Sequence, residues 1–367
     1  MKKNFLLLFI CILFLVPCLA QDNNPLFVVS NNGKQGYIDK TGKVIIKPQF
    51  DEASEFSEGL ARIQINGLYG FIDESGKITI KPQFGWVKNF SENLAAVDVG
   101  GKRGFINKQG ELAIAPQFEE VQDFSDGLAA VKIHSETGFL YTRTKNILPD
   151  LWAYIDKTGK QVIQPQFIYG YPFQNGIARF WTGAFVSINK YGLINKSGKE
   201  IIEPIFDNIE GDFNEGFAPF RIGNKWGFIN EAGEIVIKAE FDIARGFSEG
   251  LGRIAIKNKY NVPLWGYVDR TGKIVIEPQF ADAFDFSEGL ARVKTFDDKG
   301  WKTGFVNKTG SIAIKPKFVI AEDFRNGLAK ISVPSKEKAI DPHNNEYRIY
   351  KSGYINDIGK WIWKPRL

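Results

Sequence analysis

The chain has 367 residues, of which 44% are hydrophobic and 24% charged, and its formal net charge at pH 7 is +5. With 14% aromatic residues, this composition excludes an intrinsically disordered chain. Only two cysteines and two histidines are present, which leaves few groups for metal, redox or nucleophilic chemistry. Lysine and arginine are spread singly along the chain, so the sequence lacks the basic patch that a nucleic-acid partner requires.

Residues 1–20 are predicted to be an export signal peptide. Lys2 and Lys3 precede an apolar run over residues 5–16, and small residues stand three and one positions before a cleavage site after Ala20. The run is shorter than the roughly 20 apolar residues that span a bilayer, and no later segment approaches that length. We therefore expect an exported protein that lies in the periplasm, at the cell envelope or outside the cell.

Both cysteines, Cys11 and Cys18, lie within this signal. A mature chain that begins at residue 21 has no cysteine, which excludes disulfides and thiol chemistry. The residues before Cys18 also resemble a bacterial lipobox, in which the cysteine carries a lipid, although Pro17 departs from the small residue that is usual there. We favour simple cleavage and keep a lipid anchor at Cys18 as the alternative.

Beyond residue 20 the chain is repetitive. A four-residue phrase such as Gly70-Phe-Ile-Asp recurs nine times, at intervals of 34 to 49 residues. The phrase begins at Gly36, Gly70, Gly104, Ala153, Gly192, Gly227, Gly266, Gly304 and Gly353. A period near 34 residues with insertions indicates one repeat architecture over residues 21–367.

Each repeat predicts two strands joined by a tight turn. A glycine follows six positions after the start of each phrase, as Gly76 follows Gly70, and an Asp or Asn stands three residues before it. This spacing favours a turn closed by a residue with positive φ. Beyond the turn, Ile78, Ile80 and Phe84 alternate with polar residues, as expected for a half-buried strand.

A third strand completes each unit. A second phenylalanine and a turn follow, as in Phe56-Ser-Glu-Gly59, and the segment 60–65 then reads as a strand that returns through Asn66-Gly67 to the next phrase. The fold expected is all-β, an array of about nine three-stranded antiparallel meanders. The units begin near residues 26, 60, 94, 128, 177, 217, 251, 290 and 328.

The arrangement of the units has two possible forms. A single meander cannot cover its own apolar face, so neighbouring units must stack. Propellers usually have four to eight blades of four strands, and the complete first and last units leave no offset strand to lock a ring. We therefore favour an open, curved or superhelical array and keep a closed, propeller-like ring as the alternative.

The array resembles the bacterial WG-repeat proteins, also described as KWG repeats. Trp226-Gly227 and Trp265-Gly266 match the signature of that family, and Lys225 completes its longer form. Some units depart from the signature, because Ala153 replaces the glycine and Arg103 replaces the aromatic residue. The resemblance covers nearly all of residues 21–367; it implies a β-repeat scaffold, and the family supplies no catalytic residues to transfer.

Insertions fall at one place in the repeat. The link from the turn after the second phenylalanine to the next phrase spans 11 residues in three cases and 15 to 26 residues in five. All of the lengthening lies in one hairpin, so we expect these loops to project from one edge of the array, where repeat proteins often bind partners.

These loops are rich in aromatic residues. Aromatic side chains on loops can stack on sugars or anchor a peptide; they can also simply extend the hairpins and pack on one another. The candidate ligand-binding residues are Phe139, Tyr141, Trp181, Phe185, Tyr260, Trp301 and Tyr347.

The sequence gives little support for a catalytic function. His134 stands beside Ser135 and Glu136, but adjacent residues of a strand point to opposite faces, so they do not form a triad. The repeated aspartate of the turn, such as Asp73, is replaced by Asn107 in the next unit, so this position serves the turn. The two histidines lie far apart in the sequence, which leaves a zinc site without ligands.

We therefore expect a protein that is not an enzyme, with no catalytic residues, metal or cofactor. Its expected function is that of an exported repeat scaffold that binds a protein or peptide at the cell envelope through the insertion loops. A glycan-binding envelope protein that uses loop aromatics such as Trp181 and Trp301 is the alternative. A hydrolase built on the repeat scaffold is a remote third.

Overall fold

The protein consists of small antiparallel β-sheets arranged in a ring. The structure, a computed structural model, describes residues 25–134, 150–181, 190–211, 213–298, 300–340 and 346–365. Within these residues it contains 34 strands and no helix. The predicted signal peptide, including Cys18, lies outside the described residues.

Nine sheets follow one another along the chain. Sheet 1 comprises β1 (Phe27–Asn31), β2 (Lys34–Ile38) and β3 (Val44–Phe50). Sheet 2 comprises β4 (Glu52–Ala53), β5 (Leu60–Ile65), β6 (Leu68–Asp73) and β7 (Ile78–Phe84), and sheet 3 comprises β8 (Ala95–Val99), β9 (Lys102–Ile106) and β10 (Leu112–Phe118). Sheet 4 comprises β11 (Glu120–Val121), β12 (Leu128–His134), β13 (Asp150–Asp156) and β14 (Gln161–Phe167).

The later sheets all have four strands. Sheet 5 comprises β15 (Tyr169–Gly170), β16 (Ile177–Trp181), β17 (Tyr191–Asn195) and β18 (Glu200–Phe206), and sheet 6 comprises β19 (Asn208–Ile209), β20 (Phe217–Ile222), β21 (Lys225–Asn230) and β22 (Ile235–Phe241). Sheet 7 comprises β23 (Ile243–Ser248), β24 (Leu251–Lys257), β25 (Pro263–Val268) and β26 (Ile274–Phe280). Sheet 8 comprises β27 (Asp282–Ser287), β28 (Leu290–Asp297), β29 (Gly300–Asn307) and β30 (Ile312–Phe318), and sheet 9 comprises β31 (Ile320–Arg325), β32 (Leu328–Ile340), β33 (Glu346–Ile355) and β34 (Trp361–Trp363).

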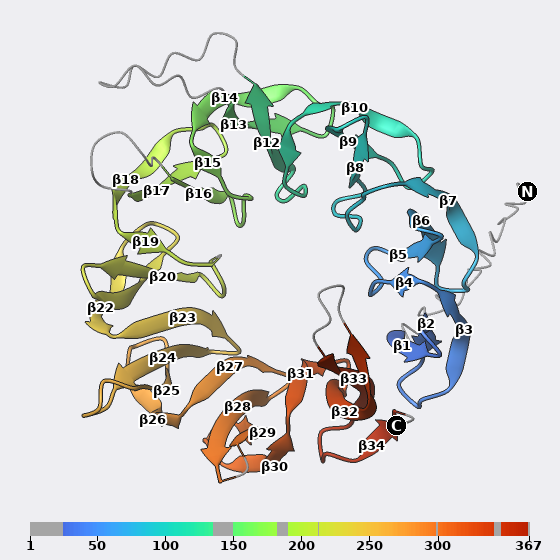
Figure 1. The fold of residues 1–367 in the computed structure, drawn as a ribbon. Coiled ribbons are helices and arrows are strands. Elements are labelled where there is room, and N and C mark those ends of the chain that lie inside the picture. The colour runs from blue at the N-terminus through green and yellow to red at the C-terminus, as the bar shows by residue number, and fades with distance from the viewer. Residues whose placement is uncertain are drawn as a thin grey trace, which may run out of the picture.

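The expected three-stranded meander is present in every sheet, and seven sheets carry a fourth strand before it. In sheet 2 this strand is β4, which pairs with β5 through Glu52 opposite Gln64 and Ala53 opposite Ile63. In sheet 3 the corresponding segment makes only the isolated bridge between Val87 and Val97. Within a sheet the first strand lies nearest the middle of the ring and the last at its rim, as sheets 7 and 8 illustrate (Figure 1).

Apolar side chains fill the spaces between neighbouring sheets. Between sheets 6 and 7, for example, Phe228 and Ile237 from one side pack with Phe247 and Ile254 from the other, and all four side chains are almost fully buried. Each sheet packs both of its faces against neighbouring sheets, so the stability of each repeat depends on the repeats beside it, as in other repeat proteins.

The ring is closed. Sheet 1 lies beside sheet 9 (Figure 1), and Phe27 and Tyr354 pack edge to face with ring centroids 5.3 Å apart. The Tyr354 hydroxyl donates a hydrogen bond to the Val28 carbonyl at 3.0 Å. The all-β repeat array is thus confirmed, and of the two arrangements the structure has the ring that the sequence analysis ranked second. No offset strand is needed, because the seam closes by the same face-to-face packing as the other junctions.

Candidate functional site

The insertions share one structural position. In each four-stranded sheet the hairpin between the second and third strands corresponds to the variable link, and the five long links are the hairpins β12–β13, β16–β17, β24–β25, β28–β29 and β32–β33. Equivalent strands run in the same direction in every sheet, so these hairpin ends lie on the same edge of the ring. We call this the insertion edge.

The structure describes only some of the predicted binding residues. Phe139, Tyr141 and Phe185 lie outside the described residues. Tyr347 lies in β33, paired with Ala339. The remaining three are Trp181, which ends β16 and is half-buried, and Tyr260 and Trp301, which are exposed.

Sheets 7 and 8, which are neighbours, carry the most exposed aromatic side chains of the described residues. Tyr260 lies in the turn of hairpin β24–β25 and is 74% exposed. Phe296 and Trp301 face each other across hairpin β28–β29, with ring centroids 5.1 Å apart, and are 67% and 55% exposed. Three large rings are therefore presented to solvent on the insertion edge.

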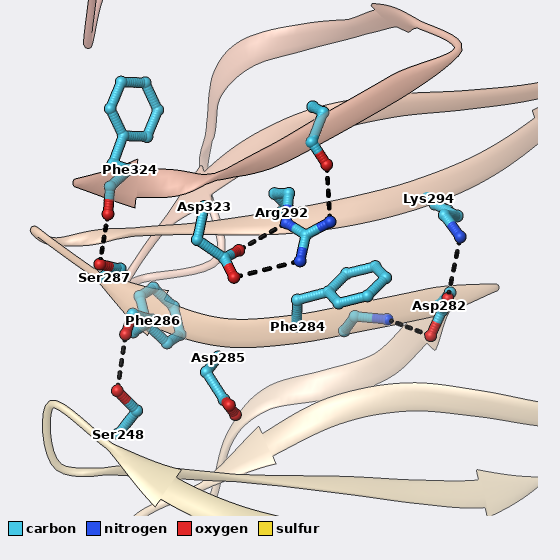
Figure 2. Close-up of polar contacts among 12 residues, drawn as sticks. Ser248, Asp282, Phe284, Asp285, Phe286, Ser287, Arg292, Lys294, Asp323 and Phe324 are labelled. Carbon is cyan, nitrogen blue, oxygen red and sulfur yellow. Dashed lines mark hydrogen bonds and ion pairs between the residues drawn. The ribbon is translucent and has the colours of Figure 1, made fainter. Parts of the chain in front are cut away.

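Polar contacts join sheet 8 to its neighbouring sheets (Figure 2). Arg292 of β28 donates to the Ala321 carbonyl at 2.6 Å and to Asp323 of sheet 9 at 3.1 Å, and its guanidinium lies 3.8 Å from the Phe284 ring centroid. The Ser287 hydroxyl donates to the Phe324 carbonyl at 2.5 Å. Because these bonds join one sheet to the next, they hold the hairpins in fixed relative positions.

The turns between the third and fourth strands lie at the opposite edge. In sheet 2 the Ser75 hydroxyl donates to Asp73 Oδ1 at 2.6 Å, and this bond holds the pKa of Asp73 below its usual value. The backbone N–H groups of Ser75 and Lys77 donate to the same oxygen at 3.0 and 3.1 Å. Asn107 accepts the equivalent backbone bonds in sheet 3, so the charge itself is dispensable for the turn.

Sequence reasoning missed a cluster of aromatic residues between sheets 4 and 5. Tyr169 packs against Trp152 and Tyr171 with centroid distances of 4.8 and 4.7 Å, and Tyr171 lies 6.3 Å from Tyr191. Burial, aided by a hydrogen bond with Tyr191, raises the pKa of Tyr171 to about 12. Tyr169 and Tyr171 precede β16, outside the insertions, and Tyr191 begins β17, so the cluster forms only through the pairing of strands far apart in the sequence.

The described part of the chain offers neither a metal-binding cluster nor a membrane-spanning helix. Its histidine, aspartate and glutamate residues form no group of three or more that could hold a metal ion. None of its segments forms a helix that is both long and apolar enough to cross a membrane.

The family model of the WG-containing repeat matches eight segments of the sequence, and together they cover well over half of the chain. The matched segments are residues 36–69, 69–102, 104–135, 152–180, 191–226, 226–260, 265–299 and 304–333. The chain belongs to the WG-repeat family. No curated protein matches the sequence.

Solved structures resemble this WG-repeat protein in fold. A crystal structure of a eukaryotic initiation factor superposes with a TM-score of 0.55 at 13% sequence identity, over 79% of this chain and 84% of that chain. Hsv2 of Kluyveromyces lactis has a TM-score of 0.36 at 9% identity, over 71% of this chain and 94% of that chain. An acylaminoacyl peptidase of Pyrococcus horikoshii has the same score and identity, over 92% and 51%. The last two scores are too low for any inference, and the first concerns the fold alone.

The signature residues of the WG repeat have structural roles here. Trp226 and Trp265 are nearly buried, and the Arg245 guanidinium lies 5.9 and 5.8 Å from their ring centroids, so that it is placed between two successive repeats. Arg245 also forms an ion pair with Glu210 at 2.6 Å. Lys225, before the signature tryptophan, pairs with Asp242 in the link to the next sheet at 2.8 Å. The signature residues therefore join neighbouring repeats.

Proposed function

We propose that this WG-repeat protein is an exported, non-enzymatic scaffold that binds a protein or peptide partner at the cell envelope through its insertion edge. Export rests on the signal peptide predicted for residues 1–20. Partner binding rests on the side chains that the insertion hairpins present to solvent.

The observation that carries the proposal is the exposure of Tyr260, Phe296 and Trp301 on two neighbouring sheets. Aromatic residues are enriched at protein interfaces and supply most of the binding energy when a partner buries them. Phe296 and Trp301 stabilise their hairpin by packing on each other, yet more than half of each side chain remains exposed. They are therefore the strongest candidates for the centre of a contact surface.

The frame behind these hairpins favours binding over catalysis. Interlocking contacts such as those of Arg292 keep the sheets in place, and a preorganised surface loses little conformational entropy when a partner binds. The repeated carboxylates, by contrast, are engaged in turns: Asp73 accepts three hydrogen bonds from its own turn. A group held in this way is poorly placed to act as a general base.

The test is capture of partners from the native cell envelope by cross-linking. The baits are residues 21–367, a variant whose five long hairpins are cut to the short form, and the double variant Phe296→Ser and Trp301→Ser. Ile312→Ser is the matched control, because Ile312 is similarly exposed, at 57%, but lies in the outer strand β30.

We expect the same partner to be captured by the intact chain and by the Ile312 variant, and to be lost from the other two baits. Equal capture by all four baits would contradict the proposal. Binding to a glycan array that disappears when Trp181 and Trp301 become alanine would replace the peptide partner with a sugar.

A further inference from the structure

The outer strands of four adjoining sheets carry a series of lysines. The strands β30, β34, β3 and β7 follow one another along the outside of the ring and across its seam (Figure 1). Gly359 of sheet 9 lies against Ile314 of β30, and Gly42 of sheet 1 lies against Ile362 of β34. Lysines that stand singly in the sequence are thus brought together by the repeat and by the closure of the ring. We call the lysines in these strands or directly beside them the basic sector; they are Lys315, Lys317, Lys360, Lys364, Lys43, Lys47, Lys77 and Lys81.

The lysines of the basic sector are exposed, and most of their charge is uncompensated. None of the eight ammonium groups forms an ion pair or a hydrogen bond within the described residues, whereas Lys34 on the insertion side pairs with an aspartate at 2.5 Å. The strands β30, β34, β3 and β7 contain no acidic residue. Lys43 and Lys77 lose part of their effect to Asp39 and Asp73, which share their turns.

The outer strands of the other five sheets differ at the same place. In the basic sector the fourth residue of β3, β7 and β30 is a lysine. The equivalent residues of sheets 3 to 7 are Ala115, Gln164, Glu203, Lys238 and Glu277. Lysine on an edge strand discourages pairing with other chains, but four of these five edge strands have no lysine there. Edge protection therefore does not account for the clustering of lysines in sheets 8, 9, 1 and 2.

We propose that the basic sector binds a linear acidic polysaccharide of the cell envelope, which follows the rim across these four sheets. The site lies on the outer strands, apart from the insertion hairpins, so it goes beyond the proposed partner contact. Packed sheets lie about 10 Å apart, which is close to the Debye length of about 10 Å at 0.1 M salt. The potentials of lysines on adjoining sheets therefore reinforce one another, and a polymer that contacts several sheets gains from each.

The shape of the site favours a flexible chain over a membrane surface. The four strands follow the curved outside of the ring (Figure 1), so a flat bilayer meets few of them at a time, whereas a polymer bends with the curve. Apolar side chains such as Ile78 and Ile312 are exposed in the sector, but Ile235 and Val275 are similarly exposed outside it. These apolar groups are therefore a feature of every outer strand and do not indicate a membrane.

The side chains of the sector also give little basis for binding a nucleic acid. Single-stranded nucleic acids stack their bases on accessible aromatic rings, and the aromatic rings of the four strands are buried or half-buried in the described part of the chain. The cations of the sector are all lysines. An ammonium group is a point charge and makes none of the bidentate contacts by which arginine recognises phosphate.

Two glutamines favour a sugar polymer over an acidic peptide. Gln49 and Gln83 are exposed and stand two residues after Lys47 and Lys81 on the same strands. A carboxamide both donates and accepts hydrogen bonds, as do the hydroxyls of a sugar, whereas an ionised carboxylate side chain only accepts them. Lysines that attract the carboxylates of an acidic polysaccharide are thus placed beside amides that match its hydroxyls.

The experiment is a calorimetric titration of residues 21–367 with polygalacturonate, beside neutral dextran of similar length. We expect saturable binding of polygalacturonate only. Because lysine contacts with a polyanion release its counterions, the affinity should fall more than tenfold between about 50 and 200 mM salt.

The lysines are tested by two triple variants that change the net charge equally. The sector variant should weaken the binding of polygalacturonate about tenfold at 50 mM salt, and it combines Lys47→Gln, Lys81→Gln and Lys315→Gln. The control variant alters exposed lysines in or beside the outer strands of sheets 5, 6 and 7 and should keep nearly the full affinity; it combines Lys199→Gln, Lys238→Gln and Lys273→Gln.

The glutamines test the identity of the polymer. The double variant Gln49→Ala and Gln83→Ala should weaken the binding of polygalacturonate about fivefold, because it removes two amides that bond to hydroxyls. It should leave any binding of polyglutamate and of poly(dT) unchanged. Gln166→Ala is the matched control, because Gln166 is exposed at the equivalent place of β14 in sheet 4.

Four results would overturn the inference. They are a folded chain that shows no saturable binding of polygalacturonate, an equal loss of affinity in the two triple variants, a loss in the glutamine variant that is equal for all three polyanions, and tighter binding to vesicles of anionic phospholipid than to polygalacturonate. If urea unfolding shows that the sector variant is unstable, Lys317→Gln with Lys364→Gln serves in its place. None of these measurements involves the insertion hairpins, so failure here would leave the proposed function standing.

Discussion

The glycine of the WG phrase lies against the backbone of the outer strand. A Cβ atom added to Gly70 would stand 2.4 Å from the Ile80 carbonyl oxygen and 2.6 Å from the Pro82 nitrogen, both on β7. The pairing of β6 with β7 shifts register at this point, which brings the two backbones close together. The glycine is thus required by a close approach of backbone, and Ala153 marks the one phrase in which a methyl group is accommodated.

This close approach predicts a marked cost for Gly70→Ala. Overpacking of this kind costs about 2 kcal/mol, and we expect a loss of that order in the free energy of unfolding measured by urea denaturation. Gly85→Ala is the control, because a Cβ atom there meets no atom within 4 Å, and its effect should stay within about 0.5 kcal/mol. Equal costs for the two variants would show that the backbone contact is unimportant.

The tight turns were the most predictable elements. The spacing of Asp73 and Gly76 predicted a turn closed by a residue with positive φ, and Gly76 has φ of 85° with its N–H bonded to the Asp73 carbonyl at 2.9 Å. Asn93, which stands where other repeats have the glycine of the turn after the second phenylalanine, has φ of 69°. Such turns depend on residues close in sequence, which is why the sequence alone identifies them.

The fourth strand was not predictable in the same way. β4 contains only Glu52 and Ala53. Two residues are too few to show the alternation of apolar and polar side chains by which a strand is predicted. It forms because Glu52 and Ala53 meet Gln64 and Ile63 once the chain has turned back. The cluster of Tyr169, Tyr171 and Tyr191 was missed for a similar reason, since the Tyr171 ring meets Tyr191 only once β16 and β17 have paired.

The turn aspartates predict a dependence of stability on pH. Hydroxyl donors such as Ser75 hold the pKa of these carboxylates below the unfolded value, and the four residues are Asp39, Asp73, Asp156 and Asp269. A lowered folded pKa adds stability above the unfolded value of about 3.9, and that stability is lost as the pH falls through the folded pKa. We therefore expect the free energy of unfolding to decrease below about pH 4.

Replacement of all four aspartates by asparagine tests this dependence. Asparagine already accepts the equivalent backbone bonds at Asn107, so the turns should still form. The variant should be less stable than the parent chain near pH 7, because the contribution of the ionised carboxylates is missing, and it should lose less stability on acidification. Urea denaturation from pH 7 to pH 2 measures both quantities. An unchanged acid slope would show that other groups cause the loss.

At the scale of the whole molecule, the sequence predicted the repeat and its count but not its closure. The ring closes only if the small rotations between successive sheets add up to a full turn over the nine sheets. The sequence of one repeat does not reveal that total rotation. At the seam, Gly42 of sheet 1 lies against Ile362 of sheet 9, as Gly76 of sheet 2 lies against Ile46 of sheet 1. The seam therefore repeats a contact found inside the array.

Closure also affects how the hairpins of the insertion edge lie relative to one another. In a ring, hairpins from sheets 4, 5, 7, 8 and 9 share one edge, and a partner could contact several of them together. In an open array the first and last units would lie far apart. Closure thus limits how far apart the hairpins of the insertion edge can lie.

Energy transfer between two dyes tests the ring most directly. Residues 21–367 contain no cysteine, so Thr41→Cys and Ile358→Cys place dyes in equivalent turns of sheets 1 and 9, and both side chains are exposed. Thr41→Cys with Ser75→Cys is the control for neighbouring sheets, and Thr41→Cys with Lys196→Cys is the control for distant ones. The ring predicts that transfer between positions 41 and 358 is as efficient as between 41 and 75. Transfer as weak as that between 41 and 196, or weaker, would contradict a closed ring.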